Sequence, residues 1–197
     1  MRLPARAAAI ASLAVLLLLL LGSVLTAADV RVRDLDDRPI DPLKAPAGAK
    51  AMAFLFVSVD CPISNRYAPE VRRLYDKFTA QGITFSLVYP NPVEPVAAIR
   101  RHLKDYSYPM RALRDPRHEL VKMAGATITP EAVVVDPHGR VLYRGRIDDR
   151  YVSLGLERPV ATRRDLDEAL TDITAGKAPR QATTPAVGCF IADFVQP

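Results

Sequence analysis

The sequence predicts an α/β fold in which a central mixed sheet is flanked by helices. Three observations support this prediction. Two strongly apolar runs, 51–59 and 83–90, enclose a helical pattern, which is the order of a βαβ unit with two parallel strands. Residues 129–147 form two strand-like runs around a DPHG turn, which predicts an antiparallel hairpin. A capped amphipathic helix over 162–176 follows the hairpin.

The first βαβ unit has the clearest pattern. The run AMAFLFVSV at 51–59 is almost continuously apolar, as expected for a strand buried on both faces. A helix is predicted over 63–82, and Gly82 ends it. Its apolar positions recur at helical spacing, at Val71, Leu74, Tyr75 and Phe78. The run ITFSLVYP at 83–90 predicts a second buried strand that a proline stops.

Shorter elements complete the expected domain. They are an edge strand or hairpin at 29–42, a helix at 94–106, a short strand at 109–113 and a helix at 115–125. Asp115 is the expected N-cap of the last helix and Pro116 its first residue, and Gly125 is expected to end it.

The first 28 residues have the pattern of a signal peptide. A short basic segment, MRLPAR, precedes the continuous apolar run 7–22, and the small residues Thr26 and Ala28 fit cleavage before Asp29. An uncleaved N-terminal anchor is the second interpretation, because the apolar run is long for a signal peptide and short for a spanning helix. We expect the domain to lie outside the cytoplasm, in the periplasm or secreted. An uncleaved leader would anchor it to the membrane, facing the periplasm.

The remainder divides into one domain, residues 29–176, and a C-terminal tail, residues 177–197, that carries Cys189. The tail is expected to be irregular. It contains an apolar patch whose side chains are expected to dock on the domain, namely Phe190, Ile191 and Phe194.

Charge and motifs exclude several functions. The formal net charge is +5, with basic and acidic residues mixed and no basic stripe, so no nucleic-acid partner is expected. There is no GxGxxG or CxxCH motif, and no cofactor is expected. Three scattered histidines and the lack of CxxC argue against a metal site. These histidines are expected at the surface, His102 and His118 on helices and His138 in a turn.

Cys61 stands at the predicted junction between a buried strand and a helix. The free N–H groups and positive dipole end of a helix favour a thiolate at this place. Pro69, eight residues later, falls inside the helical pattern and predicts a kink. Thr129 and Pro130 precede the first strand of the hairpin. In these three features the chain resembles the thioredoxin-like superfamily and, within it, the redoxin (AhpC/TSA-like) group.

The resemblance covers about residues 29–176. It implies a thioredoxin-like three-layer fold with a helical insertion between Pro90 and Thr127. It also implies a cis peptide bond before Pro130, opposite Cys61, in a loop that presents its backbone to substrate. The implied activity is that of a thiol-dependent oxidoreductase, by disulfide exchange with a protein partner or by reduction of a small peroxide, as in the antioxidant members.

The motif departs from both family patterns. The dithiol motif CxxC is CPIS here, and Ser64 cannot form a disulfide with Cys61. Of the peroxiredoxin motif, Ser58 fits the hydroxyl position, but Phe54 stands where a proline belongs. Cys61 is therefore the expected nucleophile. The resemblance assigns substrate binding to the residues around it, namely Pro62, Ser64, Asn65, Arg66, Thr129 and Pro130.

Electrostatic support for Cys61 is expected from its helix. Asn65 and Arg66 are candidates for a hydrogen-bond donor and a positive charge beside the sulfur, and Arg146 is a weaker candidate. Asp60 is expected to point to solvent or to cap the helix.

Cys189 is the only other cysteine, so one intramolecular pair is possible. The leading hypothesis is that Cys189 resolves oxidised Cys61. The alternatives are a static structural disulfide, a buried free thiol, or pairing with another protein.

Two other functions stay open. One is a thioredoxin-like module that binds a partner without catalysis. The other is a copper carrier that uses Cys61 and Cys189 with His118 or His138, although no spacing selects such a site.

Overall fold

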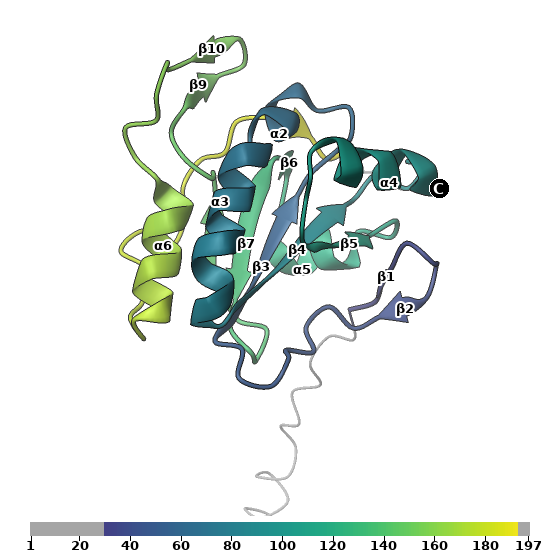
Figure 1. Cartoon of the computed structure of the whole chain (residues 1–197), viewed down its shortest axis with the longest axis horizontal. Helices are drawn as coiled ribbons and strands as arrows, with labels where there is room; N and C mark the ends of the chain where they lie inside the picture. Colours follow the sequence, from purple (N-terminus) through teal and green to yellow (C-terminus); the bar gives the residue numbers. More distant parts are fainter. Residues whose placement is uncertain (1–29, 193–197) are drawn as a thin grey trace, which may run out of the picture.

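The structure is a computed structural model of the whole chain, and it describes residues 30–192. The proposed leader and Phe194 lie outside these residues. The described part has three layers, with a mixed sheet between helices (Figure 1). The predicted α/β fold is therefore confirmed. None of the described helices is long and apolar enough to cross a membrane.

The main sheet has the strand order β2-β1-β5-β4-β3-β7-β8. Its parallel part consists of β3 (Ala51–Phe56), β4 (Ile83–Tyr89) and β5 (Arg111–Arg114). Antiparallel pairs extend it on both sides, with β7 (Glu131–Val135) and β8 (Val141–Gly145) on one side and the hairpin β1 (Val32–Arg33) and β2 (Pro39–Ile40) on the other. The βαβ unit and both predicted hairpins are thus present.

Strand β3 is buried along its whole length, because successive side chains enter opposite layers. Leu55 and the other side chains on its face of β3 pack against α3 (Ala68–Phe78), α4 (Val96–Asp105) and α6 (Asp165–Thr174). Phe54 and the other side chains on the opposite face of β3 pack against α5 (Glu119–Ala124). This double burial fixes the end of β3, from which the chain runs directly to Cys61.

The helix predicted over 63–82 is broken near its start. It consists of α2 (Pro62–Arg66), a turn at Tyr67, α3, and a 3-10 turn η1 (Thr79–Gln81) that Gly82 ends at φ 92°. Pro69 lies in the first turn of α3, where its missing N–H costs least. The break falls just before Pro69, as its position predicts.

The start of α5 differs from the prediction. The helix begins at Glu119 instead of 115, and the residue before it, His118, has a left-handed φ of 55°. Asp115 is nevertheless the capping group, because its buried carboxylate accepts hydrogen bonds from the N–H groups of Glu119 (2.9 Å) and Val121 (2.8 Å). The prediction of Pro116 as the first helical residue was wrong, because a turn separates the capping side chain from its helix.

The tail is more ordered than predicted. Its backbone runs beside β8, where Thr184 donates to the Arg144 carbonyl (3.0 Å) and its hydroxyl meets the hydroxyl of Tyr143 (2.7 Å). It then forms a two-residue strand, β11 (Cys189–Phe190), that pairs antiparallel with β6 (Ile128–Thr129). The expectation that Phe190 docks was wrong, since its side chain is 81% exposed.

A second small hairpin stands away from the sheet (Figure 1). It is formed by β9 (Tyr151–Ser153) and β10 (Leu156–Glu157). It lies between β8 and α6 in the sequence and exposes Leu154 and Leu156.

Candidate active site around Cys61 and Cys189

Cys61 follows β3 through a short turn and is the N-cap residue of α2, with extended backbone (φ −84°, ψ 109°). Its own N–H donates to the Ser58 carbonyl (3.3 Å), and its carbonyl accepts from the N–H of Asn65 (3.1 Å). The residue is only 2% exposed. The fold therefore holds the sulfur at the end of a buried strand and under a covering segment.

That covering segment carries the second cysteine. The Sγ atoms of Cys61 and Cys189 are 2.9 Å apart, and both cysteines are free thiols. The Cys61 Sγ also lies 3.0 Å from the carbonyl oxygen of Thr129. Thus two residues that are 128 positions apart in the sequence meet in one site.

The pairing of β11 with β6 places Cys189. Cys189 is in register with Thr129, and Phe190 is in register with Ile128. The N–H of Ile191 continues the ladder by donating to the Thr127 carbonyl (3.0 Å). The position of Cys189 therefore depends chiefly on the main-chain pairing of β11 with β6.

Strand β6, with which β11 pairs, is held in place by the residues that follow it in the chain. The peptide bond between Thr129 and Pro130 is cis, as the family resemblance implies. The buried carboxylate of Glu131 accepts hydrogen bonds from the N–H groups of Thr127 (2.8 Å) and Ile128 (3.3 Å). Glu131 thereby fixes the backbone against which β11 pairs.

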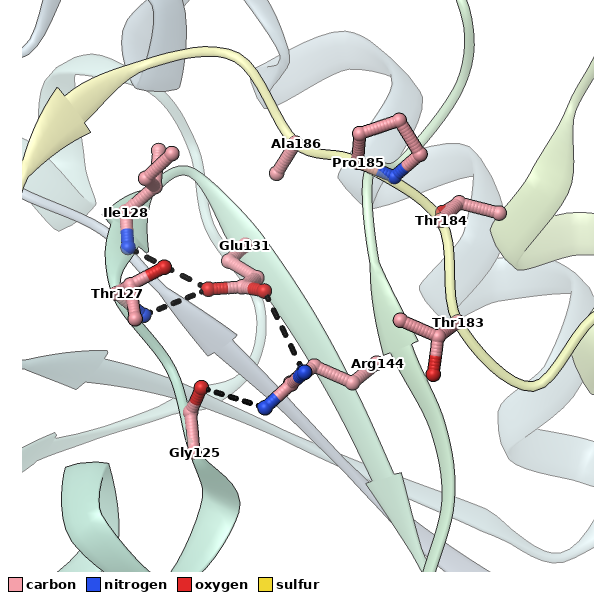
Figure 2. A pocket seen from close by; sticks show the side chains of 9 residues that line it. All are labelled: Gly125, Thr127, Ile128, Glu131, Arg144, Thr183, Thr184, Pro185 and Ala186. Carbon is pink, nitrogen blue, oxygen red and sulfur yellow. Dashed lines mark hydrogen bonds and ion pairs between the residues drawn. The ribbon is translucent and has the colours of Figure 1, made fainter.

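Figure 2 shows this support as one wall of a pocket of about 410 Å³. Glu131 and Arg144 point toward each other across its floor, and Arg144 donates to the Gly125 carbonyl (2.9 Å). Residues 183–186 of the tail form the opposite wall. The carboxylate and the guanidinium are both bonded to the surrounding protein, so their evident task is structural.

The two thiols differ in acidity. Burial acts to raise the pKa of Cys61, but the hydrogen bond from the Cys189 thiol and the nearby Ser64 outweigh it, so that the pKa lies below its usual value. Burial, together with the contact to Cys61, raises the pKa of Cys189 to about 11. Cys61 is therefore the more acidic thiol of the pair, and Cys189 is the less acidic thiol that donates to it.

Ser64 contributes to this difference from inside the protein. It is 1% exposed, and its hydroxyl has no hydrogen-bond partner at ordinary distances in the described structure. It lies close enough to Cys61 to favour the thiolate. The resemblance assigns Ser64 to substrate binding, and this role stays a prediction, because the side chain is buried in the site as the structure has it.

Asn65 has a different role from the one expected. Its amide donates to the Val59 carbonyl (3.0 Å), and its Oδ1 lies 2.8 Å from Nε2 of His102. Nδ1 of the same ring meets the hydroxyl of Tyr89 at 2.8 Å. Asn65 therefore fixes the turn before Cys61 to α4 and β4 and does not donate to the sulfur. His102 is buried, which overturns its expected place at the surface, and burial lowers its pKa.

Glu94 supports the same turn. Its Oε1 accepts from the N–H of Val59 (2.9 Å) and lies 3.5 Å from the Ser58 hydroxyl. The residue is 5% exposed, and its other oxygen has no hydrogen-bond partner in the described structure. Burial raises the pKa of Glu94. No local pattern marked this residue, because it lies in the loop before α4, far from Cys61 in the sequence.

The expected cationic partners of Cys61 are engaged elsewhere. Arg66 is exposed and pairs with Glu157 on β10 (2.8 Å). Arg146 pairs with buried Asp165 (2.7 Å). Asp60 is exposed, as expected. The prediction of an arginine beside the sulfur was therefore wrong, and the lowered pKa of Cys61 has neutral donors as its cause.

Pro62 is exposed beside the sulfur. It lines a pocket of about 320 Å³ together with Ile63, Arg66 and the β9–β10 hairpin, which contributes Tyr151 and Leu156.

The remaining histidines do not form a cation site with the thiols. His118 is 6% exposed, contrary to the surface position expected, and its Nε2 lies 2.9 Å from the Pro90 carbonyl. His138 is exposed in its turn, as predicted. Between residues 30 and 192 no group of three or more His, Cys, Asp or Glu side chains is arranged to hold a metal.

The part of the chain that contains this site matches a known protein family. The family model for Redoxin matches residues 26–154, which include Cys61 and the cis-proline loop. The chain belongs to the redoxin family. Family membership and two thiols in contact together place it among the thiol-dependent oxidoreductases. No curated protein matches the chain.

Solved structures establish the fold of this redoxin. A hypothetical protein from Sinorhizobium meliloti is 24% identical, with a TM-score of 0.70 over 84% of this chain and 91% of its own. An uncharacterized conserved protein from Geobacillus kaustophilus is 22% identical, with a TM-score of 0.71 over 85% and 89%. A secreted Mycobacterium tuberculosis disulfide oxidoreductase, described as homologous to E. coli DsbE, is 15% identical with a TM-score of 0.51 over 75% and 96%.

Proposed function

We propose that this redoxin is an extracytoplasmic thiol–disulfide oxidoreductase in which Cys61 is the nucleophile and Cys189 the resolving thiol. The observation that carries the proposal is the 2.9 Å contact between the two sulfurs, one of low and one of raised pKa. A nucleophile works as a thiolate, and its resolving partner must reach it without rearranging the sheet. The tail supplies the second thiol that Ser64 cannot.

The exchange proceeds in two steps. The Cys61 thiolate attacks one sulfur of a partner disulfide, forms a mixed disulfide and releases the other partner sulfur as a thiolate. Cys189 then loses its proton and attacks the Cys61 sulfur, which forms the Cys61–Cys189 bond and releases the second partner thiolate. The partner gains two electrons and the two cysteines lose two. A thiol donor restores them by the same steps in reverse.

Disulfide exchange is favoured over peroxide reduction by the charge around the sulfur. A peroxide substrate needs positive charge or strong donors where the O–O bond breaks. Both candidate arginines, Arg66 and Arg146, are paired with carboxylates elsewhere. A disulfide substrate makes no such demand, because its leaving group is a thiolate.

Two features support this location, namely the leader pattern in residues 1–28 and a cysteine pair whose disulfide would persist in an oxidising compartment. Sequencing the N-terminus of the protein from a periplasmic fraction tests it. A new terminus at Asp29 supports cleavage, and the intact terminus in a membrane fraction supports the anchor.

Intact mass with disulfide mapping tests the activity. Reduced protein mixed with oxidised glutathione is expected to form the Cys61–Cys189 bridge, and Cys189→Ser is expected to stop with glutathione on Cys61. Cys61→Ser is the matched control and is expected to stay unmodified at neutral pH. The proposal fails if Cys61 gains glutathione no faster than an ordinary thiol. A much faster oxidation by hydrogen peroxide would reassign the chain to peroxide reduction.

A further inference from the structure

The segment that carries Cys189 also closes the site. With β11 seated on β6, Cys61 is 2% exposed and is enclosed by the Cys189 sulfur and the Thr129 carbonyl. A partner disulfide carried on a polypeptide is much larger than a single sulfur atom. It therefore cannot reach Cys61 while β11 remains in place.

Strand β11 shows what fits this position. It is an extended segment with a cysteine in register with Thr129, held by main-chain pairing and by the Ile191 N–H. Main-chain pairing at a strand edge accepts any extended segment, and side-chain space adds the selectivity. Only one strand at a time can occupy this edge of β6.

The side-chain space is restricted next to the cysteine. A Cβ atom added at Gly188 would lie 2.1 Å from the Thr129 carbonyl oxygen and 2.7 Å from a methyl group of Ile128. These are contacts that real Cβ atoms do not make, and one of them is to backbone. A strand seated like β11 therefore needs glycine immediately before its cysteine.

We propose that β11 is an internal stand-in for the partner. An extended partner segment with glycine before a disulfide-bonded cysteine replaces β11 on β6, and the return of β11 expels it. This inference rests on the proposed function and adds to it the partner class and the order of events. The mixed disulfide forms while β11 is displaced. Because Cys189 attacks only when β11 pairs again, resolution and release of the partner are one movement.

β11 is held by a short stretch of main-chain pairing and by the partly buried side chains of Val187 and Ile191, and contacts this limited suit such an exchange. The strand has two residues, and the side chain of Phe190 is 81% exposed. Upstream of Val187, the tail is hydrogen-bonded to β8 at Thr184, which is buried. The segment after Thr184 can therefore leave without disturbing the sheet.

The test uses the full chain with Cys61 as its single thiol. Cys189→Ser keeps the tail seated, and adding Gly188→Ala forces it off β6. The probe is the peptide AVGCFIA, which copies residues 186–192, with its cysteine activated as a disulfide to thiopyridine. Dithiodipyridine is the small probe with the same leaving group. A second variant that displaces the tail is Ile191→Pro, which removes the N–H that donates to the Thr127 carbonyl. Circular dichroism checks that each variant is folded.

The quantity to compare is the rate at which the peptide reacts with Cys61, divided by the rate for dithiodipyridine. This ratio is expected to be at least about tenfold higher in the variant with the displaced tail than in the variant with the seated tail. The reason is that a site open only a small fraction of the time reacts in proportion to that fraction. Two control peptides should lose this advantage on the displaced variant. One has valine in place of its glycine, and the other is N-methylated at the residue matching Ile191.

Equal relative rates with seated and displaced tails, or control peptides as fast as the parent, would overturn the inference and leave the proposed function intact. A Cys61 that reacts with dithiodipyridine no faster than an ordinary thiol would instead overturn the proposed function, and this inference with it.

Discussion

The Glu94 carboxylate accepts a 2.9 Å hydrogen bond from the backbone N–H of Val59, two residues before Cys61. It comes from the loop between β4 and α4 and is buried, with one oxygen unsatisfied in the described structure. A buried carboxyl in this state favours its protonated form, so burial raises its pKa. The turn that positions Cys61 therefore rests on a group whose charge is disfavoured by the fold.

Replacing Glu94 by Gln should make stability less dependent on pH. The pKa of Glu94 is raised in the folded protein, so the protonated carboxyl is compatible with the fold, and stability is lost as the pH rises through the folded pKa. Glu94→Gln keeps an acceptor for Val59 and cannot ionise. Its unfolding free energy, measured with urea at several pH values, should rise relative to wild type as the pH increases. Glu168→Gln, at a half-buried position, is the control. A difference between Glu94→Gln and wild type that is constant with pH would contradict the expectation.

Replacing Cys189 by Ala should raise the pKa of Cys61. Burial opposes the thiolate, and the Cys189 thiol is one of the donors that outweigh it. Thiolate absorbance in the ultraviolet, followed against pH, should place the Cys61 transition higher in Cys189→Ala than in wild type. In Cys61→Ala, the pKa of Cys189 should fall from about 11, because one of its causes is removed. An unchanged Cys61 transition would mean that Cys189 does not stabilise the thiolate.

Oxidation should stabilise the fold strongly. A bond between Cys61 and Cys189 closes a loop of 128 residues. Loop entropy then favours the oxidised protein by up to about 5 kcal/mol. Urea unfolding of the wild type with and without reductant measures the difference. Cys189→Ser should show no dependence on reductant, and a wild type that behaves like it would show that the bridge does not form.

Asn65→Ala should destabilise the protein although the residue is near the surface. The substitution leaves the Val59 carbonyl and the His102 ring without their shared partner. Losing a partner of buried polar groups costs about 1–3 kcal/mol. Asn91→Ala, whose side chain accepts only from the exposed Val93 N–H, is the matched control with an expected change within about 0.5 kcal/mol. Equal effects in urea unfolding would show that Asn65 is not a structural link.

The fold was predictable where the pattern was local and long. The apolar run of β3 and the helical spacing around Leu74 specify their elements without reference to the rest of the chain. Pro69 predicted the helix break for the same reason, since its effect acts on its own turn. The start of α5 was not predictable, because Asp115 caps the helix across a turn that only the backbone conformation reveals.

The position of Cys61 between a buried strand and a helix was predictable from the sequence, and the surroundings of Cys61 were less so. Cys61 and the cis-proline loop are marked by position next to β3 and β7. The partners of Asn65 and Glu94 are contacts made only after β4 and α4 have packed. Strand β11 has two residues and no periodicity, so its pairing depends entirely on the free edge of β6.

The attachment of Thr184 to β8 affects the rate at which Cys189 attacks a mixed disulfide on Cys61. Cys189 lies only five positions after Thr184, and an extended stretch of that length spans at most about 17 Å. The tail is therefore a short tether, and a displaced Cys189 stays within a small volume around Cys61. Its effective concentration there is on the order of millimolar, so a dilute thiol in the surrounding medium is a poor competitor for the mixed disulfide.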